Sequence, residues 1–430
     1  MKHTLLPLAV ALAFLLPIFP AAGQVPDRLK YFIPAPPAGL QEAASFGWRV
    51  AQDARYTVVG APFDDIGGGD SGVVKVFDST TGALLFLLTN PGPATPDMSD
   101  NFGFAVAISG TRLVVAAYHE DMGSTDSGSA YVYDLSSSTP TVPVVTLHNP
   151  SPTLNDQFGY SVAISGTRVV VGTPYDDTGA TDAGSVYVYD LSSSTPTVPV
   201  ATLNNPTPTP YEQFGNSVAI SGTRVVVGTP YDDTGAINAG SVYVYDLSSG
   251  TPPVPGVTLN NPSPAQYDYF GVSVAVSGTR VIVGAMFDDA DAPDAGSVYV
   301  YDLSSEIPTA PVGTLNNPDP TSFDQFGAAV AISGTMAVVG AHGDDAGAPD
   351  TGSAYVYDLG SATPAVAVAA LNNPGPVQSD FFGYSVAIAD KRVVVGAWAD
   401  DTGAPNAGSA YVYHVSSGMA TVLVATLRRR

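Results

Sequence analysis

Adjacent pairs of acidic residues recur along this chain, and carboxylates in pairs can bind a cation. The pairs are Asp64 with Asp65, Glu120 with Asp121, Asp176 with Asp177, Asp232 with Asp233, Asp288 with Asp289, Asp344 with Asp345, and Asp400 with Asp401. An acid or amide, such as Asp182, follows six residues after the first member of each pair. Because calcium prefers oxygen ligands, one hypothesis is that these aspartates, Asp182 included, hold a divalent cation in each loop. The alternative is turn chemistry, since aspartate accepts backbone N–H bonds in loops and tolerates unusual backbone angles.

A second set of acids stands two positions before a recurrent Phe-Gly pair. Its members are Asp100, Asp156, Glu212, Asp268, Asp324 and Asp380, and the first copy has Ala44 there. If both sets lie at the same end of the repeated unit, one face of the molecule should be ringed by carboxylates. We expect this acidic face, around the axis, to contact a partner.

The loop that carries each acid pair begins with residues that differ between copies. Pro-Tyr is common at that point, and the replacements are Tyr118, His119, Met286, Phe287, His342 and Trp398. A partner that recognises one side of a repeated structure has to contact residues that are not repeated. We therefore predict that these six side chains form the partner-binding surface.

No catalytic residue is predicted. His119, His148, His342 and His414 lie at different places in the repeat, so no metal-binding cluster of histidines is evident. Serines are abundant in turns but lack the context of a nucleophile elbow. An active site usually needs a few unique residues that converge on one pocket. A hydrolase or lyase remains an alternative to a binding function.

The positions of all these residues are set by one long period. Phe-Gly occurs at Phe46, Phe102, Phe158, Phe214, Phe270, Phe326 and Phe382, and every interval is 56 residues. A fixed long period is the signature of a repeat architecture. The predicted organisation is a leader at 1–23, a lead-in at 24–45, seven repeats over 46–427, which start at these phenylalanines, and a basic tail at 428–430.

Each repeat reads as four β-strands. In the third copy these are Ser161–Ile164, Val169–Val171, Ser185–Tyr189 and Val198–Leu203, with a glycine turn between the first two. The middle strands are apolar on both faces, which indicates burial on both sides. The fold class predicted is all-β, a seven-bladed β-propeller of four-stranded antiparallel blades. A parallel β-solenoid is the alternative, although its coils are usually much shorter than this unit.

Two segments could supply the last strand of the ring. Val422–Leu427 follows the third strand of the seventh copy, and residues 29–33 precede the first copy. We expect the C-terminal segment to take the position.

The Phe-Gly pair followed by Val-Gly-Ala-Pro variants resembles the FG-GAP repeat of integrin α-subunit propellers and of many exported bacterial proteins. The second half of the motif is present as Gly60-Ala61-Pro62 and, in variant form, as Gly396-Ala397-Trp398. The resemblance implies a propeller that acts in adhesion or binding. Integrin-type repeats often carry a calcium loop between the first and second strands, but this chain has only short turns there, such as Ser165-Gly166-Thr167. Those sites therefore cannot be carried over.

Composition bounds location and partners. The basic start, the apolar run Leu5–Phe19 and the small residues up to Gly23 predict a secretory signal peptide, hence a secreted or cell-surface protein. The net charge of −24 argues against nucleic acid as a partner, and no later segment is apolar enough to span a membrane as a helix. We expect a monomer that binds a protein or carbohydrate and has calcium as its only candidate cofactor. The first alternative to a binding module is a structural scaffold of a cell surface or extracellular layer, and the hydrolase or lyase is the second.

Overall fold

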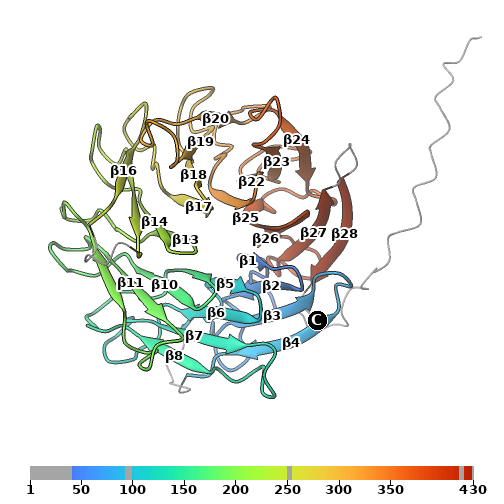
Figure 1. Ribbon diagram of the computed structural model, residues 1–430. Coiled ribbons are helices and arrows are strands. Elements are labelled where there is room, and N and C mark those ends of the chain that lie inside the picture. The colour runs from blue at the N-terminus through green and yellow to red at the C-terminus, as the bar shows by residue number, and fades with distance from the viewer. Residues whose placement is uncertain (1–40, 93–98, 249–253, 416–420, 429–430) are drawn as a thin grey trace, which may run out of the picture.

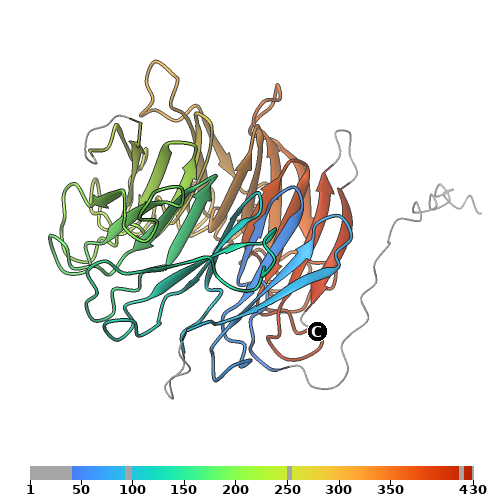
Figure 2. The ribbon, with the colours of Figure 1, turned by 60° about the horizontal axis from the view of Figure 1, so that its bottom comes forward.

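The strands form seven sheets of four, arranged around one axis. The computed structural model describes residues 41–92, 99–248, 254–415 and 421–428, and its 28 strands pair antiparallel in sequence order within each sheet. Figure 1 shows the sheets as blades of a disc, and Figure 2 shows their strands crossing the thickness of that disc. The seven-bladed β-propeller is confirmed, and the antiparallel pairing excludes the parallel solenoid. The described residues contain no helix that could cross a membrane.

Each blade begins near the axis and ends at the rim. The innermost strands are β1 (Arg49–Gln52), β5 (Ala105–Ser109), β9 (Ser161–Ser165), β13 (Ser217–Ser221), β17 (Ser273–Ser277), β21 (Ala329–Ser333) and β25 (Phe382–Ala389). The second strands are β2 (Tyr56–Ala61), β6 (Arg112–Ala117), β10 (Arg168–Thr173), β14 (Arg224–Thr229), β18 (Arg280–Ala285), β22 (Met336–Ala341) and β26 (Arg392–Ala397). The third strands are β3 (Val73–Asp78), β7 (Ser129–Asp134), β11 (Ser185–Asp190), β15 (Ser241–Asp246), β19 (Ser297–Asp302), β23 (Ser353–Asp358) and β27 (Ser409–Val415). The outer strands are β4 (Leu84–Thr89), β8 (Val145–His148), β12 (Ala201–Asn204), β16 (Val257–Asn260), β20 (Gly313–Asn316), β24 (Ala367–Asn372) and β28 (Thr421–Arg428).

The outer strand of the third blade is shorter than predicted. It was expected to begin at Val198, but β12 begins at Ala201. Pro199 has no N–H to donate to the ladder, and the N–H of Val198 donates to the carbonyl of Thr195 in a turn. Val198 and Val200 are consequently exposed at the rim.

The phenylalanine of each Phe-Gly pair joins two blades. Phe214 is fully buried between Val186 of the third blade and Val225 of the fourth. Its N–H donates to the carbonyl of Ala183 in the preceding blade (2.9 Å). A β-carbon at Gly184, where φ is +87°, would overlap the carbonyl oxygen of Phe214. Glycine is required there by both the close approach and the backbone angle.

The same joint closes the ring between the seventh and first blades. The N–H of Phe46 donates to the carbonyl of Ala407 (3.0 Å), and the hydroxyl of Ser385 donates to the carbonyl of Gly47 (2.8 Å). β28 pairs with β27, so the C-terminal strand completes the seventh blade, and Arg428 belongs to that strand. The predicted leader (1–23), the alternative strand at 29–33, and residues 429 and 430 of the basic tail lie outside the described residues.

Candidate functional site at the axial mouth

The residues around the axis come from two columns of the repeat directly after Phe-Gly. Two positions after the phenylalanine stand Trp48, Phe104, Tyr160, Asn216, Val272, Ala328 and Tyr384. Three positions after it stand Arg49, Ala105, Ser161, Ser217, Ser273, Ala329 and Ser385. Every repeat places these residues at the start of the innermost strand, so the seven copies converge on the axis. Two positions after the phenylalanine, the seventh, first, second and third blades carry aromatic residues, and the fourth to sixth blades carry smaller ones.

Aromatic side chains from consecutive blades touch one another at this position. The Trp48 ring lies 4.9 Å from the Tyr384 ring, 5.3 Å from Phe63, 5.5 Å from Trp398 and 5.7 Å from Phe104, measured between centroids. Such edge-on and tilted contacts are the favoured geometries for aromatic pairs. Trp48 is therefore the centre of a cluster that spans the seventh, first and second blades.

Four of the six predicted partner-binding residues join this cluster. Tyr118 lies 4.1 Å from Phe104, and His119 lies 3.8 Å from Tyr118. Trp398 stacks on Phe381 at 5.4 Å, and His342 lies 5.3 Å from Tyr384. We call the whole set the aromatic arc, and its members are Trp48, Phe63, Phe104, Tyr118, His119, Tyr160, Tyr175, His342, Phe381, Tyr384 and Trp398.

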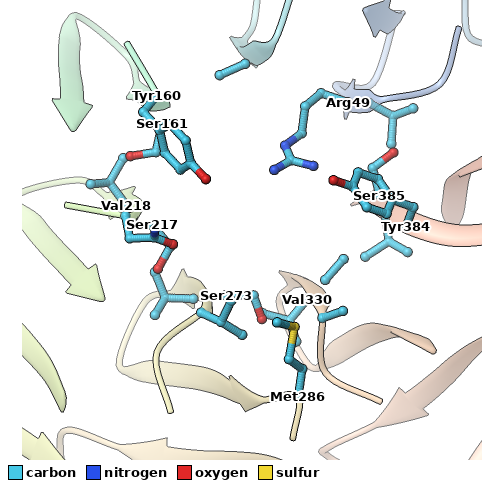
Figure 3. A pocket seen from close by; sticks show the side chains of 18 of the residues that line it. Arg49, Tyr160, Ser161, Ser217, Val218, Ser273, Met286, Val330, Tyr384 and Ser385 are labelled. Carbon is cyan, nitrogen blue, oxygen red and sulfur yellow. The ribbon is translucent and has the colours of Figure 1, made fainter. Parts of the chain in front are cut away.

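The other two predicted residues lie apart from the arc. Phe287 packs 5.3 Å from Tyr269, which also contacts Tyr231 and Tyr267. Met286 lines the cavity on the axis. Six positions predicted as one surface thus divide into an arc, a smaller aromatic group and Met286, which lines the cavity (Figure 3).

An axial cavity of about 430 Å³ lies between the innermost strands. Its polar lining includes Arg49, Tyr160, Asn216, Gln325 and His342, and no aspartate or glutamate is among the lining residues. Figure 3 shows the Arg49 guanidinium and the Tyr160 hydroxyl pointing toward the middle from different walls. Its size is within the usual range for small-molecule sites, about 300–1,000 Å³.

Several polar atoms beside the cavity are buried without a hydrogen-bond partner in the described part of the chain. They are the indole N–H groups of Trp48 and Trp398 and the Nδ1 atom of His342. Burial lowers the pKa of His342 to about 4, so its ring is neutral at pH 7. Unpaired buried polar groups are rare in folded proteins and require an explanation.

The predicted metal ligands have a different environment. The first acid of each pair is at most 8% exposed, and in blades two to seven it accepts a hydrogen bond from a tyrosine of the third strand. Asp176, for example, accepts from the Tyr187 hydroxyl (2.9 Å) and from the N–H of Thr178 (2.8 Å). The first blade has Lys75 in the place of that tyrosine.

The second acid of each pair is exposed and caps its own loop. The Asp177 Oδ1 atom accepts the N–H of Asp182 (3.0 Å), and Asp65, Asp121, Asp233, Asp289, Asp345 and Asp401 make the same bond. Asp182 has a φ of +51°, a backbone angle that aspartate tolerates better than most residues. These bonds are the turn chemistry that was the alternative to a cation.

The acids before Phe-Gly are buried in the crossovers between blades. Asp380 accepts hydrogen bonds from the Asn373 side-chain amide (2.6 Å) and from the N–H of Val377 (2.7 Å). Burial is the main cause that raises the pKa of both Asp100 and Asp380 to about 6. Burial likewise raises the pKa of Asp156, Glu212, Asp268 and Asp324.

Fewer carboxylates are therefore exposed on this face than the sequence indicated. Of the acids repeated in each loop and crossover, only the second member of each pair is exposed in every blade, since the first member and the crossover acid are buried. Within the described residues no three histidine, aspartate or glutamate side chains are grouped closely enough to hold a metal ion.

Trp48, Arg49, Phe104, Tyr160 and Tyr384 were missed by the sequence analysis. The available signal was the pair of columns after Phe-Gly, in which these residues depart from serine, alanine and asparagine. Those positions read as the beginning of an ordinary strand, and nothing in the strand pattern marks them as axial.

Comparisons with known proteins agree with the repeat seen in the fold. The model of the FG-GAP repeat family matches residues 39–77, 96–133, 150–189, 201–245, 261–301, 312–357 and 368–413. No curated protein matches the sequence.

Proposed function

This chain belongs to the FG-GAP repeat family and forms a β-propeller, and we propose that it is a non-catalytic binding module. Its ligand is held over the axial cavity by the aromatic arc. The module acts outside the cell or on its surface, in keeping with the predicted leader, and it acts as a monomer. Its partner is a protein or a carbohydrate.

The observation that carries this proposal is the continuous aromatic arc around a cavity that has room for a ligand. Tyr118, Trp398 and Trp48 are only half-buried, so part of each side chain is exposed to solvent. Tyrosine and tryptophan are the side chains most enriched at binding hot spots, because they offer a large rigid surface together with a polar atom. Most members of the arc, such as Trp48, Tyr118 and Trp398, differ from the residues at the same position of the other blades, as a specific site on a repeated scaffold requires.

Binding by single-residue variants tests the proposal. The wild-type chain is screened on arrays of oligosaccharides and peptides, and dissociation constants are then measured for the best ligand. We expect Trp398→Ala and Tyr118→Ala each to weaken binding by about tenfold or more, the effect typical of a hot-spot aromatic. Tyr211→Ala is the matched control, since Tyr211 is 62% exposed and lies outside the arc. Full binding by both arc variants would contradict the proposal.

Whether the bound ligand is left intact tests the non-catalytic part. Mass spectrometry of the ligand after prolonged incubation with the protein should show no new species. A cleaved product would favour the hydrolase or lyase alternative.

A scaffold is the second candidate function, and exposed valines at the rim favour it. Val142, Val144, Val198, Val200, Val312 and Val366 are exposed beside the outer strands. An edge strand flanked by apolar side chains can pair with another molecule. Sedimentation at increasing concentration separates the candidates, because a monomer supports the binding module and concentration-dependent assembly supports the scaffold.

A further inference from the structure

Arg49 is the only charged residue among the seven that stand three positions after the phenylalanine of Phe-Gly. The same position holds serine in four blades and alanine in two. Each of these serines donates to a glycine carbonyl of the next blade, as Ser161 does to Gly215 (2.8 Å) and Ser217 to Gly271 (2.7 Å). Arg49 does not make this bond. The first blade therefore has a cation at a position where four other blades have a hydrogen bond to the next blade.

The Arg49 guanidinium is held in place by aromatic rings. It lies 5.5 Å from the centroid of the Tyr384 ring and 5.8 Å from that of Phe104, within the range for cation–π attraction. It also donates to the carbonyl of Trp48 (3.3 Å). Two rings and a carbonyl fix the side chain so that its charged end points into the cavity (Figure 3).

No carboxylate neutralises this cation in the part of the chain that the structure describes. The chain has 39 aspartates and glutamates against 15 lysines and arginines, yet none of the acids lines the cavity. A half-buried cation without a counter-ion is costly, and an anionic ligand would offset that cost. The five N–H donors of a guanidinium lie in one plane, and this geometry matches the two oxygens of a carboxylate.

We propose that the axial cavity is a receptor for the carboxylate of an acidic sugar, with Arg49 as its anchor. This assignment rests on the proposed binding function and names its ligand class. Uncharged polar side chains, namely Tyr160, Asn216, Tyr231 and Gln325, line the rest of the cavity and suit the hydroxyl groups of a sugar. The rings of Tyr160 and Tyr384 line the cavity and offer apolar surfaces against which the C–H face of a sugar ring can pack.

Titration of the full chain with glucuronate tests the proposal, with glucose as the uncharged comparison. Ligand-observed NMR gives the dissociation constants. We expect glucuronate to bind the wild type about tenfold or more tightly than glucose, because hydrogen bonds to charged groups are worth more than those between neutral groups. Arg49→Ser should bring the two constants to within about twofold of each other. Arg49→Lys should keep part of the preference, since lysine retains the charge but not the planar fork.

Arg49→Ser is expected to fold, because serine occupies this position in four other blades. Arg112→Ser is the matched control: it removes the same charge from the second strand of the second blade, where Arg112 donates to the carbonyl of Gly166 (3.4 Å). An equal loss of preference in both variants would show a net-charge effect and overturn the proposal.

Three further outcomes would be decisive. A wild type that binds glucuronate and glucose equally, yet binds an oligosaccharide through Trp398, overturns this inference and leaves the proposed function standing. Tighter binding of N-acetyl-aspartate than of glucuronate overturns the assignment to a sugar. Ligand binding that survives both Trp398→Ala and Tyr118→Ala contradicts the proposed function itself.

Discussion

The joints between blades and the axial mouth are built by opposite rules. At the joints the same phenylalanine, glycines and acids recur and make the same hydrogen bonds in blade after blade. At the mouth the two columns after Phe-Gly hold residues as different as Trp48, Arg49 and Val272. The repeated contacts at the joints stabilise the ring, and the residues that differ between blades at the mouth make one part of the ring chemically distinct from the rest. Changes at joints should therefore reduce stability, and changes at the mouth should reduce binding.

Truncating a joint phenylalanine should have the largest effect. Phe214→Ala removes a fully buried ring between two blades, which typically costs about 3–5 kcal/mol of unfolding free energy. Chemical denaturation measures the change. Tyr211→Ala, three residues earlier and mostly exposed, should change stability by no more than about 0.5 kcal/mol. Equal losses in the two variants would mean that the joint has no special role.

Two tyrosines of one strand allow the hydrogen bond to a buried loop acid to be measured separately from the loss of a hydroxyl group. Tyr243 donates to Asp232 (3.0 Å), whereas the hydroxyl of Tyr245, two residues on in β15, is buried with no partner among the described residues. Tyr243→Phe leaves a buried carboxylate short of a donor and should cost about 1–3 kcal/mol. Tyr245→Phe removes an unpaired hydroxyl and should be neutral or slightly stabilising. The same denaturation assay applies, and a larger loss for Tyr245→Phe would reverse the assignment.

Because the pKa values of the buried crossover acids are raised, we predict that the fold is more stable in mild acid than at neutral pH. In the folded state Asp100 and Asp380 have a pKa of about 6, above the usual value near 4, so the fold binds protons more readily than the unfolded chain. Their contribution is fully present below about pH 4 and is lost as the pH rises through 6. The melting temperature should therefore be higher at pH 5 than at pH 7, by about 1–3 °C.

Two variants check this pH dependence. Asp380→Asn keeps an oxygen that can accept from Val377 and should flatten the dependence by stabilising the fold at pH 7. Asp302 is a contrast, because hydrogen bonds from Ser304 lower its pKa. Its contribution is lost as the pH falls below about 4, so Asp302→Asn should act mainly at neutral pH and leave the rise between pH 7 and 5 in place. A melting temperature that increases steadily from pH 5 to pH 7 would contradict the prediction.

Calcium should have the smallest effect. Both acids of each loop already accept hydrogen bonds within the loop, as Asp176 and Asp177 do. Melting temperatures in excess calcium and in excess chelator should therefore agree within about 1 °C, which for a chain of this size corresponds to well under 1 kcal/mol. A rise of several degrees with calcium would show that a cation does bind between the loops.

The fold could be predicted from the sequence because the period and the strand pattern indicate the same architecture. The Phe-Gly spacing indicated seven units, and the runs of valine and tyrosine indicated strands buried on both faces. The start of the outer strand was wrong by three residues in the third blade, because the apolar pattern continues through Pro199 whereas the hydrogen-bond ladder does not.

The site was predicted less completely. Tyr118, His119, His342 and Trp398 were identified as departures from the repeat, and the structure brings them into one cluster. The central Trp48 and Arg49 were not identified, because their place on the axis depends on how seven blades pack together. The burial of Asp176 and Asp380 was not predicted either, because their hydrogen-bond partners Tyr187 and Asn373 stand in other elements, 11 and 7 residues away in the sequence.

The closing joint has a mechanical consequence. Every other pair of neighbouring blades is also linked by the chain itself, whereas the seventh and first blades are held only by non-covalent contacts such as those of Phe46 with Ala407 and of Ser385 with Gly47. Tension applied between the start of the first blade and β28 would load this seam directly. The first and seventh blades should then separate while the other six joints stay intact. The axial cavity would open at the first blade, which carries Arg49.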